Sequence, residues 1–295
     1  MKYLISGATG FVGTHLLNHL RRLGQGVELI SRRPHVGCDW TRDSLLPAIK
    51  EADVLVHLAG AGVMDVAWKP ERKLELRRSR EETTGLLAEL CATAQAEGCA
   101  PRFVSASAVG YYGPRDNAVE LDETADPGHD FLAQVCMGWE QALQPARDAG
   151  VEVCVARIGV VLGSDGGALK RMLLPFKLGL GGPLGTGRQA FPWIHVQDLV
   201  RLVAFLGDAQ TTPGVFNAVA PGCVTQREFA RALGRALFRP AIAPAPAWIL
   251  KLALGKRASM LLSGQRVLPT AALAAGFEFE HGDLGEALVD LVAKG

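Results

Sequence analysis

Three glycines near the start of the chain constrain its fold more than any other feature of the sequence. Gly7 and Gly10 stand between a short apolar run at residues 3–6 and a segment at 11–23 whose apolar residues recur at helical spacing, and Gly13 lies in the first turn of that segment. A strand, a glycine loop and a helix in this order are typical of a dinucleotide-binding βαβ unit. The alternative is chance in a chain with 34 glycines, and the flanking strand and helix patterns disfavour it.

Each glycine has a physical role in such a loop. Gly7 permits the tight turn, Gly10 lets the backbone approach a pyrophosphate, and Gly13 lets the helix pack close to the sheet. The N-terminus of the helix then offers unpaired N–H groups and a partial positive charge to the phosphates. The residues expected to form this part of a cofactor site are Gly7, Thr9, Gly10, Phe11, Val12 and Gly13.

The rest of the first half alternates strand and helix patterns. Such alternation predicts a Rossmann-type doubly wound parallel sheet. After residue 160 glycines cluster and the pattern becomes mainly helical, so we expect a nucleotide-binding domain at 1–160 and a smaller lobe at 161–295 with some segments returning to the sheet. The expected strands are 27–30, 53–58, 102–107, 151–158 and 215–218, and the expected helices are 44–52, 71–97, 131–149, 168–178, 196–206, 226–237 and 248–254.

The residues after the second strand bear on which cofactor is bound. An acidic residue there would bond a ribose 2′-hydroxyl and repel a 2′-phosphate. This chain has Ser31, Arg32 and Arg33 instead. A hydroxyl and two guanidinium groups suit a 2′-phosphate, which favours NADP(H) over NAD(H). The alternative is a solvated basic turn.

Composition excludes several classes of function. The chain has 295 residues with 31 Lys and Arg against 30 Asp and Glu, so no global basic field would attract nucleic acid or a membrane. The six cysteines form no C-x-x-C pair and stand near no histidine cluster, so we expect neither a metal site nor disulfides. The start of the chain lacks a signal-peptide pattern, and a cytoplasmic location is expected.

Two further segments indicate a superfamily. The G-x-x-G-x-x-G spacing resembles that of the extended short-chain dehydrogenase/reductase superfamily. Residues 57–60 are similar to its loop beside the cofactor, which implies contacts from Leu58, Ala59 and Gly60. Residues 105–113 resemble the segment that carries the catalytic Ser or Thr; Ser107 matches best, although one residue is extra before Gly113.

A narrower resemblance covers essentially the whole chain. It is carried by the segments 157–168, 175–185, 192–198, 261–267 and 276–277, which together look like the NADP-binding "epimerase family" of atypical short-chain dehydrogenases. The resemblance implies a Rossmann fold with a small C-terminal lobe and no particular substrate. It also implies cofactor contacts from Glu75, Arg80 and Val161; the alternative for the first two is a solvated helix with i,i+4 ion pairs.

The usual catalytic pair of the superfamily is missing. Its mechanism needs Tyr-x-x-x-Lys on the helix after the catalytic Ser. When Glu140 is aligned with the Glu that commonly follows the Lys by four residues, Leu132 stands at the Tyr and Cys136 at the Lys. Leucine cannot transfer a proton, and a thiol carries no positive charge.

Two hypotheses about function follow. The first is an NADP(H)-dependent oxidoreductase or epimerase-like enzyme that binds a small molecule between its lobes and uses substitute catalytic groups, with Ser107, Tyr111 and Tyr112 as candidates. The second is an NADP(H)-binding regulatory or scaffolding protein without turnover.

Three polar residues in the second half also suggest roles. Asp198 fits a helix cap or a buried hydrogen-bond partner better than a general acid. His195 could face the cleft or pack in the core, and Arg188 could bind an anionic group or remain solvated.

Overall fold

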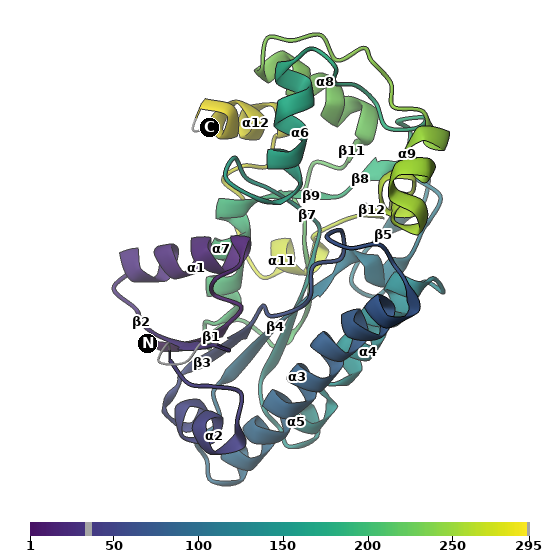
Figure 1. Ribbon diagram of the computed structural model, residues 1–295. Coiled ribbons are helices and arrows are strands. Elements are labelled where there is room, and N and C mark those ends of the chain that lie inside the picture. Colours follow the sequence, from purple (N-terminus) through teal and green to yellow (C-terminus); the bar gives the residue numbers. More distant parts are fainter. Residues whose placement is uncertain (33–36, 294–295) are drawn as a thin grey trace.

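The central feature of the fold is a parallel sheet of six strands. The computed structural model describes residues 1–32 and 37–293 (Figure 1). The strand order is β10-β6-β4-β3-β1-β2, and every neighbouring pair is parallel. The strands are β1 (Lys2–Ser6), β2 (Gly26–Ile30), β3 (Val54–His57), β4 (Arg102–Ala108), β6 (Val153–Ile158) and β10 (Gly214–Ala218). This architecture confirms the predicted doubly wound sheet.

Helices cover both faces of the sheet. On one face α1 (Phe11–Arg22) and α7 (Val196–Leu206) bury their apolar sides against it. The other face is covered by α2 (Arg42–Glu51), α3 (Pro70–Ala96) and α5 (Gln144–Asp148), and α4 (Phe131–Gln141) packs on α3. All four residues of β3 are buried, as expected of a strand with helices on both sides.

The strand order reverses at β1. The chain passes from β1 to β2 on one side and then to β3 on the other. In doubly wound sheets ligands bind at the carboxyl ends of the strands beside such a reversal. The glycine loop leaves β1 at this point.

The second half of the chain builds a smaller lobe and also contributes to the sheet layers. Its own core lies among α6 (Gly167–Lys177), α8 (Gln226–Ala236) and α12 (Leu284–Ala293), around Phe229 and Leu288. Both α7 and β10 belong to the sheet layers (Figure 1). The division at residue 160 stays a prediction.

Short elements connect these larger ones. The two-stranded pairs are β7 with β9, β8 with β11 and β5 with β12. Their bounds, with those of the remaining helices, are β5 (Glu120–Leu121), β7 (Val160–Leu162), β8 (Ala190–Phe191), β9 (Trp193–His195), β11 (Val224–Thr225), β12 (Arg266–Val267), η1 (Val109–Tyr112), α9 (Ala247–Leu254), η2 (Gly255–Ala258), α10 (Ser259–Leu262) and α11 (Thr270–Ala274).

One expected helix is two helices. The segment 131–149 divides into α4 and α5, with a break at residues 142–143. Pro145 stands in the first turn of α5, where its missing N–H costs nothing, whereas inside a continuous helix it would remove a hydrogen bond and clash with the preceding turn. Within the described ranges, no helix is both long and apolar enough to cross a membrane.

Candidate functional site

The glycine loop has the geometry of an anion-binding turn. Gly7 adopts a positive φ of 76°, and a Cβ there would lie 2.8 Å from the Ala59 amide nitrogen. A Cβ on Gly13 would lie 2.2 Å from the Gly7 carbonyl oxygen, so only glycine lets α1 come this close to the loop. Gly10 is the N-cap of α1, and no side chain caps the helix. The first amides of α1 are therefore open to an anionic ligand.

A cavity of about 670 Å³, here called the loop cavity, adjoins this turn. It is lined by residues of the glycine loop, the end of β2, the loop after β3 and one face of α3. Arg33 lies outside the described residues. The sequence-predicted residues that line the loop cavity are Gly7, Thr9, Ser31, Arg32, Ala59, Gly60 and Glu75.

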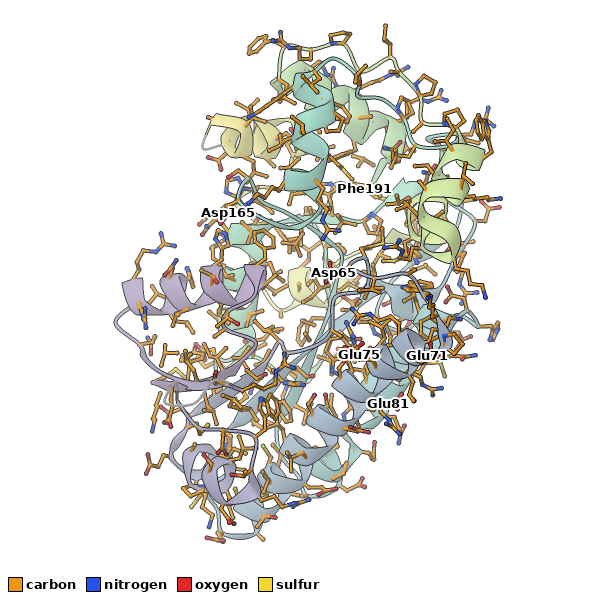
Figure 2. All side chains as sticks on the ribbon, viewed as in Figure 1. Asp65, Glu71, Glu75, Glu81, Asp165 and Phe191 are labelled. Carbon is orange, nitrogen blue, oxygen red and sulfur yellow. The ribbon has the colours of Figure 1, made fainter. Side chains whose placement is uncertain are left out.

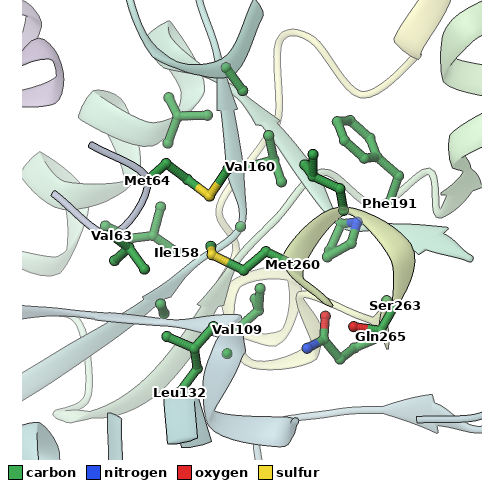
Figure 3. Close-up of a pocket in the computed structure, with 18 of the residues that line it drawn as sticks. Val63, Met64, Val109, Leu132, Ile158, Val160, Phe191, Met260, Ser263 and Gln265 are labelled. Atoms are coloured by element: carbon green, nitrogen blue, oxygen red, sulfur yellow. The ribbon is translucent and has the colours of Figure 1, made fainter. Parts of the chain in front are cut away.

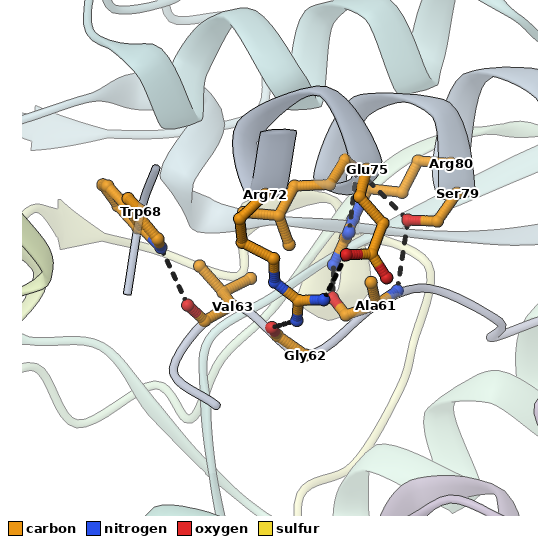
Figure 4. Close-up of polar contacts among 9 residues, drawn as sticks. Ala61, Gly62, Val63, Trp68, Arg72, Glu75, Ser79 and Arg80 are labelled. Atoms are coloured by element: carbon orange, nitrogen blue, oxygen red, sulfur yellow. Dashed lines mark hydrogen bonds and ion pairs between the residues drawn. The ribbon is translucent and has the colours of Figure 1, made fainter. Parts of the chain in front are cut away.

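Helix α3 holds the loop after β3 in place. The Ser79 hydroxyl accepts a hydrogen bond from the Ala61 amide at 3.2 Å, and Arg80 Nη2 donates to the Ala61 carbonyl at 3.0 Å. Arg72 donates to the Gly62 carbonyl and pairs with Glu75 at 2.7 Å (Figure 4). Sequence reasoning missed the bonds of Ser79 and Arg72 to this loop, because these bonds are made to backbone atoms that no motif marks.

His57 lies buried beneath this loop. Its Nδ1 is 2.6 Å from the Ser6 hydroxyl, and its Nε2 is 3.3 Å from the Thr83 hydroxyl. Burial, with a smaller contribution from the Arg80 charge, lowers the pKa of His57 to about 3. The imidazole is therefore neutral at neutral pH and serves as a hydrogen-bonded packing group.

A second cavity of about 630 Å³, here called the apolar cavity, adjoins the loop cavity at Gly62, which lines both. The residues that line it include Val63, Met64, Val109, Leu132, Ile158, Val160 and Met260 (Figure 3). The sequence-predicted residues that line it are Phe11, Val12, Arg80 and Val161. Gly10, Gly13 and Leu58 line neither cavity, and their contribution to a cofactor site stays a prediction.

The two residues that the sequence analysis aligns with the superfamily's Tyr and Lys line the apolar cavity. Leu132 and Cys136 both line it, one turn apart on α4. Burial, and after it the Glu140 carboxylate, raises the pKa of the Cys136 thiol to about 12. The thiol is therefore protonated at neutral pH and is neither a cation nor a nucleophile.

Arg80 is the cation beside this pair. Its guanidinium lines the apolar cavity, lies 5.0 Å from the Trp139 ring and donates to the carbonyls of Ala61 and Leu76. Burial lowers its pKa from the ordinary value of an arginine. Glu75 lines the loop cavity instead, so the two predicted α3 residues lie at different cavities.

The candidate catalytic residues belong to a buried polar network. Ser107 Oγ donates to Glu140 Oε1 at 2.7 Å, and Arg157 makes two 2.9 Å bonds to the same carboxylate. The Tyr112 hydroxyl accepts a bond from Arg157 at 3.0 Å and donates to Asn217. Neither residue lines the two cavities, and their catalytic role stays a prediction.

Tyr111 packs against the same network. Its ring centroid is 3.4 Å from Arg157 Cζ, and the Tyr111 and Tyr112 rings meet edge to face. Tyr111 lines neither cavity, although its neighbours Val109 and Gly110 line the apolar one. The catalytic role of Tyr111 also stays a prediction.

The remaining polar candidates have structural contacts. Asp198 is fully buried and accepts bonds from the amides of Glu280 and His281, which confirms its interpretation as a buried hydrogen-bond partner. His195 is buried, accepts a bond from the Gln197 amide and stacks on His281 with ring centroids 3.8 Å apart. Arg188 is exposed and does not line the apolar cavity.

Comparison with known protein families covers both halves of the chain. Residues 3–218 match the model described as the NAD dependent epimerase/dehydratase family. Residues 245–291 match a domain of unknown function, DUF1731. The first match includes the glycine loop and all six strands of the main sheet.

Individual relatives match over the full length. The mouse epimerase family protein SDR39U1 is 41% identical over 99% of this chain and 100% of its own. A crystal structure of human SDR39U1 (isoform 2) with NADPH has a TM-score of 0.92 at 39% identity and covers 100% of both chains. A nucleoside-diphosphate sugar epimerase from Corynebacterium glutamicum has a TM-score of 0.80 at 31% identity and covers 100% of this chain and 58% of its own.

Proposed function

Since the chain belongs to the NAD dependent epimerase/dehydratase family, we propose that it is an NADP(H)-dependent oxidoreductase acting on a small molecule in the apolar cavity. The observation that carries the proposal is the continuity of the site. The loop cavity and the apolar cavity meet at Gly62, beside the open N-terminus of α1. A relative 39% identical to this chain was crystallised with NADPH, which supports the choice of cofactor.

The residues present fit the cofactor from one end to the other. The uncapped amides of α1 would hold the pyrophosphate. Ser31 and Arg32 line the loop cavity, where they would bind the 2′-phosphate. Phe11, Val12 and Val161 would surround the nicotinamide end in the apolar cavity. When bound, the cofactor supplies or accepts a hydride.

Arg80 stands in for the missing lysine as a positive charge. It lines the apolar cavity beside Cys136, and its bonds to the carbonyls of Ala61 and Leu76 fix the guanidinium. A fixed cation at this point stabilises negative charge that develops on a reacting group. It is no proton donor at neutral pH, so protons would come from water or from the predicted candidates Ser107, Tyr111 and Tyr112.

The second candidate function is an NADP(H)-binding regulatory or scaffolding protein without turnover. Leu132 and Cys136 favour it, because they leave the cavity without the family's proton-transfer pair.

The experiment that separates the two functions follows hydride transfer. The protein is incubated with NADPH deuterated at C4 and a metabolite extract, and deuterium in the extracted metabolites is measured by mass spectrometry. Deuterated product above the level made by the Gly13→Val variant supports the oxidoreductase. Binding of NADPH without any deuterated product supports the regulatory protein.

A further inference from the structure

We infer that the apolar cavity takes an uncharged, largely apolar molecule with few polar groups, one of which Gln265 binds, and that it does not take a nucleoside diphosphate sugar. The inference rests on the proposed function only where it takes this molecule to be the substrate. Its structural basis is the lining of the cavity.

Apolar side chains from seven separate parts of the chain contribute to the walls. Three methionines stand among them, and their flexible, polarisable side chains adapt to irregular apolar ligands. Met64 and Met260, labelled in Figure 3, both line the cavity. The apolar residues that form the walls are Val63, Met64, Val109, Leu132, Val135, Ile158, Val160, Val161, Met172, Phe191, Met260 and Leu261.

Charged groups are few in this cavity, and each has a structural task. Among its described lining residues only Arg80 and Asp130 are charged. Arg80 is committed to two backbone carbonyls, and Asp130 caps α4 by accepting a bond from the Ala133 amide at 2.9 Å. A buried diphosphate needs several charge-assisted bonds to offset its desolvation, and this lining does not provide them.

A neighbouring outer cavity carries two cations, Lys170 and Arg171, and both are exposed. Arg171 is paired with Asp65 at 3.0 Å, which joins α6 to the loop after β3. Asp65 lies between α6 and α3 in Figure 2. The outer cavity adjoins the apolar cavity at Met64 and Met172. If the inference is wrong, a nucleoside diphosphate sugar would bind with its diphosphate at these exposed cations and its sugar in the apolar cavity, and the competition with UDP-glucose described below tests this case.

Most polar side chains of the apolar cavity are also bonded within the protein. Gln189 donates to the carbonyls of Leu184 and Leu261, Gln226 accepts from the Leu184 amide, and Ser263 donates to the Ser259 carbonyl. Two buried polar atoms of the lining, Gln189 Oε1 and Trp139 Nε1, have no hydrogen-bond partner within the described ranges. Gln265 differs from the other polar residues because its entire side-chain amide is unbonded within these ranges.

The Gln265 side chain makes no hydrogen bond to any residue in the described part of the chain, and its amide lies on the cavity side of the chain in Figure 3. A primary amide both donates and accepts, so it suits a carbonyl or a hydroxyl of the ligand.

The first test uses N-phenyl-1-naphthylamine, an uncharged dye whose fluorescence rises in apolar surroundings. The full-length protein is titrated with the dye, with and without NADPH, and UDP-glucose is then added as a competitor. We expect one saturable site that persists with NADPH and from which millimolar UDP-glucose does not displace the dye. Displacement by UDP-glucose, loss of the site with NADPH, or no saturable binding would overturn the inference.

A matched pair of variants locates the dye. Met260 lines the cavity, whereas Leu252 is exposed on α9 and lines none of the three cavities. Met260→Asp should weaken dye binding at least tenfold, and Leu252→Asp should leave it unchanged. Equal effects of the two variants would contradict the inference. The competition with UDP-glucose uses the unmodified protein, so it tests whether the cavity takes a nucleoside diphosphate sugar even if Met260→Asp does not fold.

A second pair of ligands tests Gln265. α-Tetralone and tetralin differ by one carbonyl group, and each is measured as a competitor of the dye. We expect the ketone to bind about two- to tenfold more tightly, as one net hydrogen bond provides. This preference should disappear in Gln265→Leu and survive in Ser263→Ala. If the preference for the ketone persists in Gln265→Leu, Gln265 does not bind the carbonyl group, and this part of the inference is wrong.

Failure of the inference is distinguishable from failure of the proposed function. NADPH binding is followed separately by the change in its own fluorescence. A protein that binds the dye as expected but no NADPH would refute the proposed function and leave the nature of the cavity as inferred. A protein that binds NADPH but exchanges dye for UDP-glucose would refute only the inference.

Discussion

Glu140 and Arg157 form the most deeply buried ion pair of the described residues, with side chains 10% and 4% exposed. Burial alone would lower the pKa of Arg157, but its bonds to Glu140 outweigh that effect and raise the pKa above the ordinary value. The pair also holds Ser107 and Tyr112. Its removal should therefore show what these polar groups contribute to stability.

Glu140→Ala should lower the free energy of unfolding by about 3–5 kcal/mol, because it leaves the Arg157 charge buried without its partner. Glu89→Ala is the matched control: Glu89 pairs with Arg42 at the surface, and its loss should cost about 1 kcal/mol or less. Urea unfolding of both variants measures the difference. Similar losses in the two would contradict the account of the network.

His57 should make the protein less stable in mild acid. Its pKa is about 3 when folded and near 6.5 when unfolded, so between these values the unfolded chain binds more protons. The free energy of unfolding should therefore fall as the pH drops below 6.5, by at most about 1.4 kcal/mol per pH unit from this residue.

The measurement compares urea unfolding at pH 4.5 and pH 7 in the unmodified protein and in His57→Gln. The variant should lose less stability between the two pH values. An equal loss in both proteins would show that His57 does not carry the effect.

At the scale of elements, the sequence predicted the sheet and the glycine loop well. Apolar runs such as β3 and the 3.6-residue pattern of α1 identify buried strands and helices directly. The site was harder to predict, because strand periodicity places Ser107 at the end of β4 but not its bond to Glu140, 33 residues away. To predict the break between α4 and α5, one has to recognise that Pro145 cannot lie inside a continuous helix and therefore marks the start of a new one.

Two helical glycines give a matched test of the loop. A Cβ on Gly13 would collide with the Gly7 carbonyl, whereas a Cβ on Gly85 in α3 would meet nothing within 4 Å. Gly13→Ala should destabilise the protein and weaken NADPH binding. Gly85→Ala should stabilise it by up to about 1 kcal/mol, because alanine favours helix.

Urea unfolding and NADPH titration of the two variants check this prediction. If Gly13→Ala binds NADPH as tightly as the unmodified protein, the close packing of α1 on the loop does not matter for the site.

In the whole molecule, the two halves of the chain meet at Phe11. A Cβ on Gly163, Gly166 or Gly167 would lie 2.3–2.9 Å from the nearest atom of the Phe11 ring, so this glycine segment of the second half packs against the start of α1. His15 on α1 pairs with Asp165 of the same segment at 3.0 Å. No sequence pattern predicted this contact, because the glycines of the second half indicated only loops.

Phe11→Ala should destabilise the protein by about 3 kcal/mol, near the lower end for truncating a packed phenylalanine, because the ring is only partly buried. It should also weaken NADPH binding, since the ring lines the apolar cavity. Phe238→Ala is the control, because Phe238 is 90% exposed. Equal stabilities of the two variants in urea would argue against this contact between the halves.

The central claim is that the site binds NADP(H) through the 2′-phosphate, and titration of the protein with NADPH and with NADH tests it most directly. Arg32 lines the loop cavity, and loss of one charge-assisted bond of about 1.5–3 kcal/mol should weaken NADPH binding ten- to a hundredfold in Arg32→Ala. Arg78→Ala, at an exposed position on α3 that lines neither cavity, should leave it unchanged. The account predicts that NADPH binds more tightly than NADH and that Arg32→Ala removes most of this preference; equal affinities for the two cofactors in the unmodified protein would contradict it.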